Sequence, residues 1–206
     1  MRDKFREKYI HAFDVGGVYV LAGRDRVIHT GTTLTIPETY KGLPVTRIGE
    51  GAFNNNGESM KLTNVTIPNS VTSIEDYAFA HNNLTEVTIP DSVISIGENA
   101  FVYNSLTEVT IGNSVTSIGY SAFARNYLTE VTIPDSVTSI GNAFFDNTNL
   151  TKITIGANVD IGSSAGGISN WGSFASFYMK EDGGNKQAGT YIYMYSNGYV
   201  TWPKQP

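Results

Sequence analysis

The sequence predicts a mainly β repeat solenoid, because four nearly identical segments follow one another directly, each starting 22 residues after the last. The segments are LTNVTIPNSVTSIEDYAFAHNN from Leu62, LTEVTIPDSVISIGENAFVYNS from Leu84, LTEVTIGNSVTSIGYSAFARNY from Leu106 and LTEVTIPDSVTSIGNAFFDNTN from Leu128. Apolar residues alternate with Thr in each segment, which is typical of a strand. Units of this kind bury their apolar faces against their neighbours, so we expect one continuous core.

The first strand of each unit is the alternation Val87, Thr88, Ile89 and its copies. This order places the Val and Ile side chains on one face and the Thr side chain on the other. Proline then ends the strand, because it has no N–H to donate. Pro stands at this position in three units and Gly in two: Pro68, Pro90, Pro134, Gly112 and Gly156.

The second half of the unit contains another short extended piece, such as Val93 to Ile96, followed by a glycine and an Ala-Phe pair. We interpret Gly97, Gly119 and Gly141 as residues that allow a turn. Phe101 and its copies then direct a ring into the interior. One asparagine recurs at a further corner (Asn82, Asn104 and Asn126), where its side chain is expected to bond the backbone of its own or the next coil.

The repeat extends in weaker form in both directions. TLTIPETYKGLPVTRIGEGAF, from Thr33 to Phe53, is predicted to be an entering coil, and LTKITIGANVDIG, from Leu150 to Gly162, keeps only the first strand. In the unit from Leu128, Phe144 occupies the position where the other units have Ala. A ring there would overpack unless the coil slips by one residue, so irregular geometry is predicted near Ala143 to Phe145.

Both flanks are predicted to cap the array. Residues 1–32 are assigned to an N-terminal capping segment with a short helix, from the spacing of Phe5, Tyr9 and Phe13, and a strand at Val18 to Leu21. Residues 33–162 form the solenoid, and residues 163–206 form an aromatic-rich C-terminal cap. The run GTYIYMYSNGYVTW predicts a hairpin that turns at Ser196-Asn197-Gly198 and covers the exposed end of the last coil.

The pattern L-x-x-V-x-I-P-x-S-V-x-S-I-G-x-x-A-F-x-x-N resembles the BspA-like leucine-rich repeat family of bacterial and protist surface proteins. The resemblance covers about residues 33–162 and implies a curved leucine-rich repeat solenoid engaged in adhesion, without catalytic residues. Many members have Cys where Asn82, Asn104 and Asn126 stand, so no thiol chemistry is carried over. The implied location is extracellular or at a cell surface.

Residues at the same outward position of successive first strands are expected to form a straight column, with neighbouring residues of the column about 4.8 Å apart. One column contains mostly Thr and its neighbour mostly Glu, and together they make the predicted partner-binding face. Its residues are Asn64, Thr66, Glu86, Thr88, Glu108, Thr110, Glu130, Thr132, Lys152 and Thr154. Repeated carboxylates favour a basic partner or a cation, and the alternative is that Glu only keeps the repeats soluble.

Composition excludes several classes of protein. With 19 acidic and 14 basic residues the net charge is -5, so nucleic acid and anionic membrane surfaces are poor partners. No apolar run is long enough to cross a membrane. The segment MRDKFREKYI has charges where a secretion signal needs apolar residues, so either the chain is intracellular or an export segment was removed.

No residues point to an enzyme, a metal or a cofactor. The string Gly162-Ser163-Ser164-Ala165-Gly166 has the form G-x-S-x-G, but all three histidines precede it. We therefore predict a non-enzymatic binding or adhesion protein whose partner is a protein or another cell-surface macromolecule. The alternatives are a structural spacer and a carbohydrate or cell-wall module that uses C-terminal aromatic residues: Trp171, Tyr191, Tyr193, Tyr195, Tyr199 and Trp202.

Overall fold

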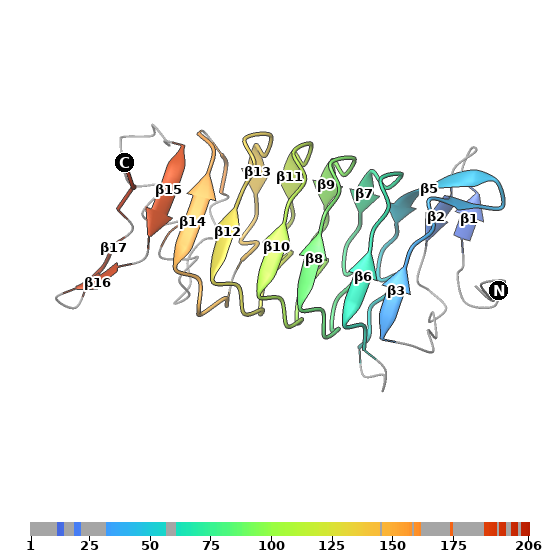
Figure 1. The fold of residues 1–206 in the computed structure, drawn as a ribbon, viewed down its shortest axis with the longest axis horizontal. Coiled ribbons are helices and arrows are strands. Elements are labelled where there is room, and N and C mark those ends of the chain that lie inside the picture. Colours follow the sequence, from blue (N-terminus) through green and yellow to red (C-terminus); the bar gives the residue numbers. More distant parts are fainter. Residues whose placement is uncertain are drawn as a thin grey trace.

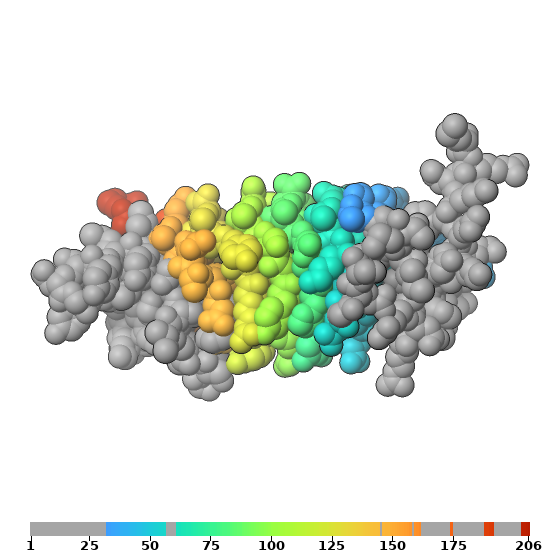
Figure 2. Space-filling model, turned by 90° about the horizontal axis from the view of Figure 1, so that it is seen from below, coloured from blue at the N-terminus to red at the C-terminus, as the bar shows by residue number. Residues whose placement is uncertain are grey.

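The computed structural model is a β-solenoid with little helix, as the repeats predict (Figure 1). It describes residues 12–14, 19–21, 32–56, 61–144, 146–157, 159–161, 174, 188–192, 194–196, 199–201 and 203–206. Each coil contributes one first strand and one shorter second strand, and successive coils follow one another along the long axis of the molecule. In the space-filling view the coils lie against each other as adjacent bands (Figure 2).

The first strands pair in parallel with identical repeat positions side by side. They are β3 (Thr33–Thr35), β6 (Asn64–Thr66), β8 (Glu86–Thr88), β10 (Glu108–Thr110), β12 (Glu130–Thr132) and β14 (Lys152–Ile155). Ladders join β3 to β6, β8 to β10 and β12 to β14, while β6 contacts β8 and β10 contacts β12. We call this set of strands, together with β15 below, the first-strand face.

The second strands form one sheet on another side of the coils. Its members from the repeats are β5 (Leu43–Ile48), β7 (Ser73–Ile74), β9 (Ser95–Ile96), β11 (Ser117–Ile118) and β13 (Ser139–Ile140), all parallel. The short strand β4 (Thr39–Tyr40) pairs antiparallel with β5.

Two N-terminal strands continue this second sheet. The antiparallel pair β1 (Ala12–Asp14) and β2 (Tyr19–Leu21) joins it where β2 runs parallel to β5. Strand β2 lies within the predicted Val18 to Leu21 segment. The predicted helix is wrong at Phe13, which lies in β1, because pairing with β2 determines the conformation there; Phe5 and Tyr9 lie outside the described residues.

The core is a set of columns that run through every coil. The rings of Phe53, Phe79, Phe101, Phe123 and Phe144 stack in order with centroids 5.1–5.4 Å apart. The four isoleucines that precede the Pro or Gly position are all buried, as the stacking of repeats requires: Ile67, Ile89, Ile111 and Ile133. Burial of identical side chains in every coil provides the main stabilisation of the array.

A ladder of buried asparagines supports the corner before each first strand. Asn104 Oδ1 accepts the Leu84 N–H at 3.1 Å, and Asn104 Nδ2 donates to the carbonyls of Phe79 and Phe101 at 3.0 and 3.1 Å. Asn82 and Asn126 make the same set of bonds. The predicted structural role of these three asparagines is confirmed.

The repeated glycines serve close packing between coils, so their interpretation as turn residues is wrong. None of Gly97, Gly119 and Gly141 has a positive φ. A Cβ on Gly119 would stand 2.6 Å from the backbone nitrogen of Glu98 in the preceding coil. A side chain is excluded there because two backbones approach each other, not because the chain turns.

In the coil that begins at Leu128 the ring and the ladder asparagine come one residue earlier than in the other coils, which confirms the predicted slip. The residue is regained between Asn147 and Leu150, so this coil still has 22 residues. Phe144 stacks on Phe123, and Asn147 takes the place of the ladder asparagine by bonding the Leu128 N–H. The lost residue lies between Gly141 and Ala143, at the corner where Tyr77, Asn99 and Ser121 have φ of 54–56° in the other coils. Deleting one corner residue lets the ring keep its place in the stack; Phe145 lies outside the described residues.

The C-terminal end of the first-strand face is covered by β15 (Gly189–Ile192), which runs antiparallel to β14. The next two strands, β16 (Met194–Ser196) and β17 (Tyr199–Thr201), pair as the predicted hairpin. The covering strand is β15 and not the hairpin. Its Tyr191 is only 5% exposed and meets the Phe174 ring edge-on at 5.4 Å.

Candidate functional site

The first-strand face brings the predicted partner-binding residues together in two straight columns. Glu86 lies beside Glu108 and Thr88 beside Thr110 in the β8–β10 ladder. Glu130 lies beside Lys152, and Thr132 beside Thr154, in the β12–β14 ladder. Of the ten residues, eight are exposed, while Asn64 and Thr154 are half-buried.

The Glu column does not have uniform charge. Lys152 Nζ donates to Glu130 Oε2 at 2.7 Å, and both side chains remain about half exposed or more. The lysine offsets the carboxylate charge at that end of the column. The adjacent Glu86 and Glu108, about one strand spacing apart, make the acidic part of the face.

The Thr column extends further than the sequence analysis assigned. Thr35 of β3 lies beside Thr66, and Thr154 Oγ1 forms a hydrogen bond of 2.9 Å with Thr190 Oγ1 of β15. Thr35 and Thr190 were not assigned to the column from the sequence, because the entering coil matches the repeat only weakly and the cap does not follow its pattern. The column therefore runs from the entering coil to the C-terminal cap.

A second exposed Thr column, just before each first strand, was missed by the sequence analysis, although its letters repeat. It consists of Thr63, Thr85, Thr107, Thr129 and Thr151. The hydroxyl of Thr107 donates to the Thr85 carbonyl at 3.3 Å, and that of Thr151 donates to the Thr129 carbonyl at 3.2 Å. These bonds link neighbouring coils, so the column has a structural role beside the face.

The described residues contain no group of three or more His, Cys, Asp or Glu side chains that could hold a metal ion. Most of the predicted carbohydrate-binding residues lie outside what the structure describes. Trp171, Tyr193 and Trp202 are not among the described residues, and only the backbone of Tyr195 and Tyr199 is described. The exception is Tyr191, whose buried ring belongs to the core cluster and offers no open face to a sugar. The G-x-S-x-G string of residues 162–166 also lies outside the described residues.

Where the structure is described, no helix has both the length and the apolar character needed to span a membrane.

The family model described as "BspA type Leucine rich repeat region" matches residues 46–165 in six copies. Among curated proteins, none matches the chain. The repeat pattern, the parallel coils and the family model agree over the same part of the molecule.

Several solved bacterial structures are similar to the chain. A T. pallidum leucine-rich repeat protein is 25% identical, with 72% of this chain and 70% of that chain covered and a TM-score of 0.64. The pneumococcal vaccine antigen PcpA is 21% identical, with 71% and 48% covered and a TM-score of 0.55. A leucine-rich cell surface protein from Faecalibacterium prausnitzii is 25% identical, with 69% and 54% covered and a TM-score of 0.42.

Proposed function

The chain belongs to the BspA-type leucine-rich repeat family, and on that premise we propose that it is a non-enzymatic binding protein whose first-strand face recognises a macromolecular partner. The family is generally non-catalytic, and its repeat domains typically bind proteins. We propose adhesion as the role and the outside of a cell as the location, in keeping with the family resemblance. In this proposal residues 33–162 form the binding unit, and residues 1–32 and 163–206 cap it.

The observation that carries the proposal is the register of the exposed side chains. Strand pairing fixes Thr88 beside Thr110 and Glu86 beside Glu108, on a backbone whose other face is buried in the common core. Such a surface is formed before the partner arrives, so binding costs little ordering of the backbone. Many modest contacts over several coils can then add up to a useful affinity.

Charge indicates the kind of protein partner. Glu86 and Glu108 are exposed and adjacent, and the whole chain is acidic. A partner with a basic patch would relieve their mutual repulsion and would be attracted over a distance that salt shortens. We therefore propose a basic protein surface as the partner of this face.

The test starts from an array of purified surface and secreted proteins probed with the labelled chain, from which the strongest binder is taken for affinity measurements. Replacing Thr88 and Thr110 together by Arg should abolish binding, because long charged side chains would block the face. The double variant E86Q/E108Q should weaken binding about 5-fold, near 1 kcal/mol, and flatten its salt dependence.

The matched control is E130Q, because Lys152 already offsets that carboxylate. It should change the affinity less than 2-fold. Equal affinities of T88R/T110R and the unchanged chain would refute binding through this face, and failure to find any binder would favour the structural spacer.

A further inference from the structure

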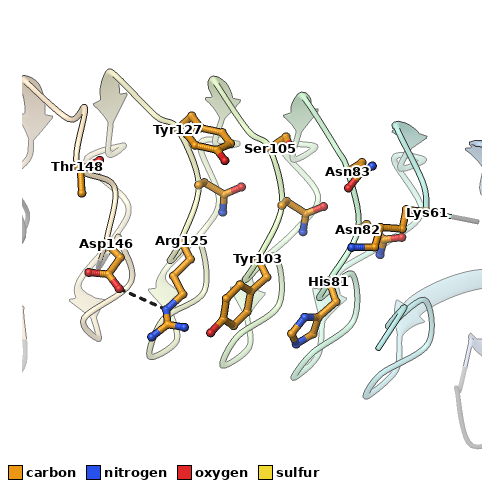
Figure 3. Close-up of a pocket in the computed structure, with 12 residues that line it drawn as sticks. Lys61, His81, Asn82, Asn83, Tyr103, Ser105, Arg125, Tyr127, Asp146 and Thr148 are labelled. Carbon is orange, nitrogen blue, oxygen red and sulfur yellow. Dashed lines mark ion pairs between the residues drawn. The ribbon is translucent and has the colours of Figure 1, made fainter. Parts of the chain in front are cut away.

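A second surface, at the corner between the Phe stack and the first strands, has the features of a ligand groove. Its volume is about 410 Å³, and it crosses the coils from Lys61 to Thr148 (Figure 3). Two columns of side chains line it, on either side of the buried asparagine ladder. We propose that this groove binds a short neutral oligosaccharide.

The first column is a packed stack of unlike side chains. The His81 and Tyr103 rings stack with centroids 4.7 Å apart, and Arg125 Cζ lies 4.6 Å from the centroid of the Tyr103 ring. Arg125 Nε then forms an ion pair with Asp146 Oδ2 at 3.3 Å (Figure 3). Each member holds the next, so polar edges are presented in fixed positions along four coils.

The second column contains the open aromatic ring. It runs Lys61, Asn83, Ser105, Tyr127 and Thr148, and Tyr127 is 57% exposed, the highest fraction among the exposed large hydrophobic residues described. The neighbours of this ring on its column are small polar side chains (Figure 3). A ring that is open on one side and flanked by hydroxyl and amide groups can take the C–H face of a sugar while its neighbours bond the hydroxyls.

The repeats differ from one another at this groove, whereas the Thr column of the first-strand face is the same in every coil. From coil to coil the first column reads His, Tyr, Arg, Asp and the second reads Lys, Asn, Ser, Tyr, Thr, whereas the asparagine between them is constant. All four residues of the first column also have φ of 54–59°, a conformation that residues other than Gly rarely adopt. The constant asparagine supplies the backbone bonds at this corner, so the side chains on either side of it can differ between coils and contact a ligand.

Charge and hydrogen bonding favour a neutral polyhydroxylated ligand. The Arg125–Asp146 pair offers donors and an acceptor side by side with its charges offset, and both side chains are more than a third exposed. Burial and the nearby Lys61 charge lower the pKa of His81, which favours its neutral imidazole. Along the groove an anionic ligand would meet the Lys61 ammonium at one end but the Asp146 carboxylate at the other. A sugar hydroxyl both donates and accepts, so it can use each of these groups.

The proposed site is distinct from the first-strand face and can be tested separately. The full chain is applied to an array of neutral oligosaccharides built from glucose, N-acetylglucosamine, mannose or galactose, with heparin as an anionic probe. The sugar with the strongest signal is then titrated by calorimetry. Binding to at least one neutral oligosaccharide, with little dependence on salt, is the expected result.

Two exposed tyrosines of the same coil make a matched pair of variants. Y127A removes the open ring of the groove and should weaken sugar binding at least 10-fold. Y120A removes a ring that is 46% exposed but does not line the groove, and it should change sugar binding less than 2-fold. D146N should also weaken binding, because one hydroxyl acceptor is lost.

Three outcomes would overturn the proposal: no binding to any neutral oligosaccharide, equal binding by Y127A and Y120A, or binding to heparin only. Thermal unfolding of each variant shows whether the fold is kept. The E86Q/E108Q variant should bind sugar normally, so a failure at this groove is distinguishable from a failure of the first-strand face.

Discussion

The buried asparagine ladder gives the sharpest stability prediction, for the substitution Asn104→Ala. Asn104 is 6% exposed, and its side chain joins the backbones of successive coils. The carbonyls of Phe79 and Phe101 each keep a second partner, because Asn82 Nδ2 and Asn126 Nδ2 also donate to them. The Leu84 N–H has no such substitute among the described bonds.

The expected loss follows from this asymmetry. One buried N–H without a partner costs about 1–3 kcal/mol, and each further lost bond to an already bonded carbonyl costs less. We expect Asn104→Ala to lower the free energy of unfolding by about 2–4 kcal/mol, a large part of the stability of a typical domain. The matched control is Asn113→Ala in the next coil, an exposed asparagine whose substitution should cost less than about 0.5 kcal/mol.

Urea unfolding followed by circular dichroism measures both variants. A second variant, Asn104→Asp, keeps an acceptor for the Leu84 N–H but points a carboxylate at two carbonyl oxygens. It should be less stable than Asn104→Ala at pH 7 and should recover partly in acid, where the protonated group donates again. If Asn104→Ala proves as stable as Asn113→Ala, the ladder does not support the corner and the reasoning is refuted.

Three further predictions concern packing and pH. Gly119→Ala should lower the free energy of unfolding by about 1–3 kcal/mol in the same urea experiment, because the new Cβ would lie 2.6 Å from the backbone of the preceding coil. The control is Gly156→Ala, which should cost less. There the atom nearest to the new Cβ would be an Asp135 side-chain oxygen at 3.1 Å. Tyr191→Ala should cost about 3–5 kcal/mol by removing a core ring, and a thermal melt indistinguishable from that of the unchanged chain would contradict its capping role. The pKa of His81 is lowered by burial and by Lys61, so the unfolded chain takes up this proton first as pH falls below about 6.5, and stability is lost until the folded pKa is passed. The melting temperature of His81→Gln should therefore fall less between about pH 7.5 and 5 than that of the unchanged chain. An equal fall in both would rule out this contribution of His81.

The sequence predicted the array well because each coil depends on the same local contacts. Val87, Phe101 and Asn104 recur with their copies at one spacing, and parallel stacking turns that spacing directly into columns. Even the slip at Phe144 followed from volume, since a second ring could not occupy a methyl-sized place.

What the sequence could not predict depends on contacts between coils at positions that vary. The glycines were assigned to turns because an isolated unit shows no reason for Gly119, and the backbone of the preceding coil supplies that reason. The Arg125–Asp146 pair and the stack of His81 on Tyr103 join residues of unlike type in different units. A search for identical residues in successive repeats does not detect such pairs. The signal that could have identified them is that the positions on either side of the constant asparagine vary from repeat to repeat.

In the two proposals above, the candidate surfaces would divide the work of recognition according to how the repeats are built. A column of identical residues such as Thr88 and Thr110 offers the same contact at every step, so a partner can bind it in several registers and gains mainly from the number of contacts. The groove offers a different residue at each step, from His81 to Asp146, so a ligand that fits has one register. Breadth should therefore come from the first-strand face and selectivity from the groove. Exchanging Arg125 and Tyr103 tests this division, because it keeps the composition of the groove and changes only its order: sugar binding should fall while binding to the basic protein is unchanged.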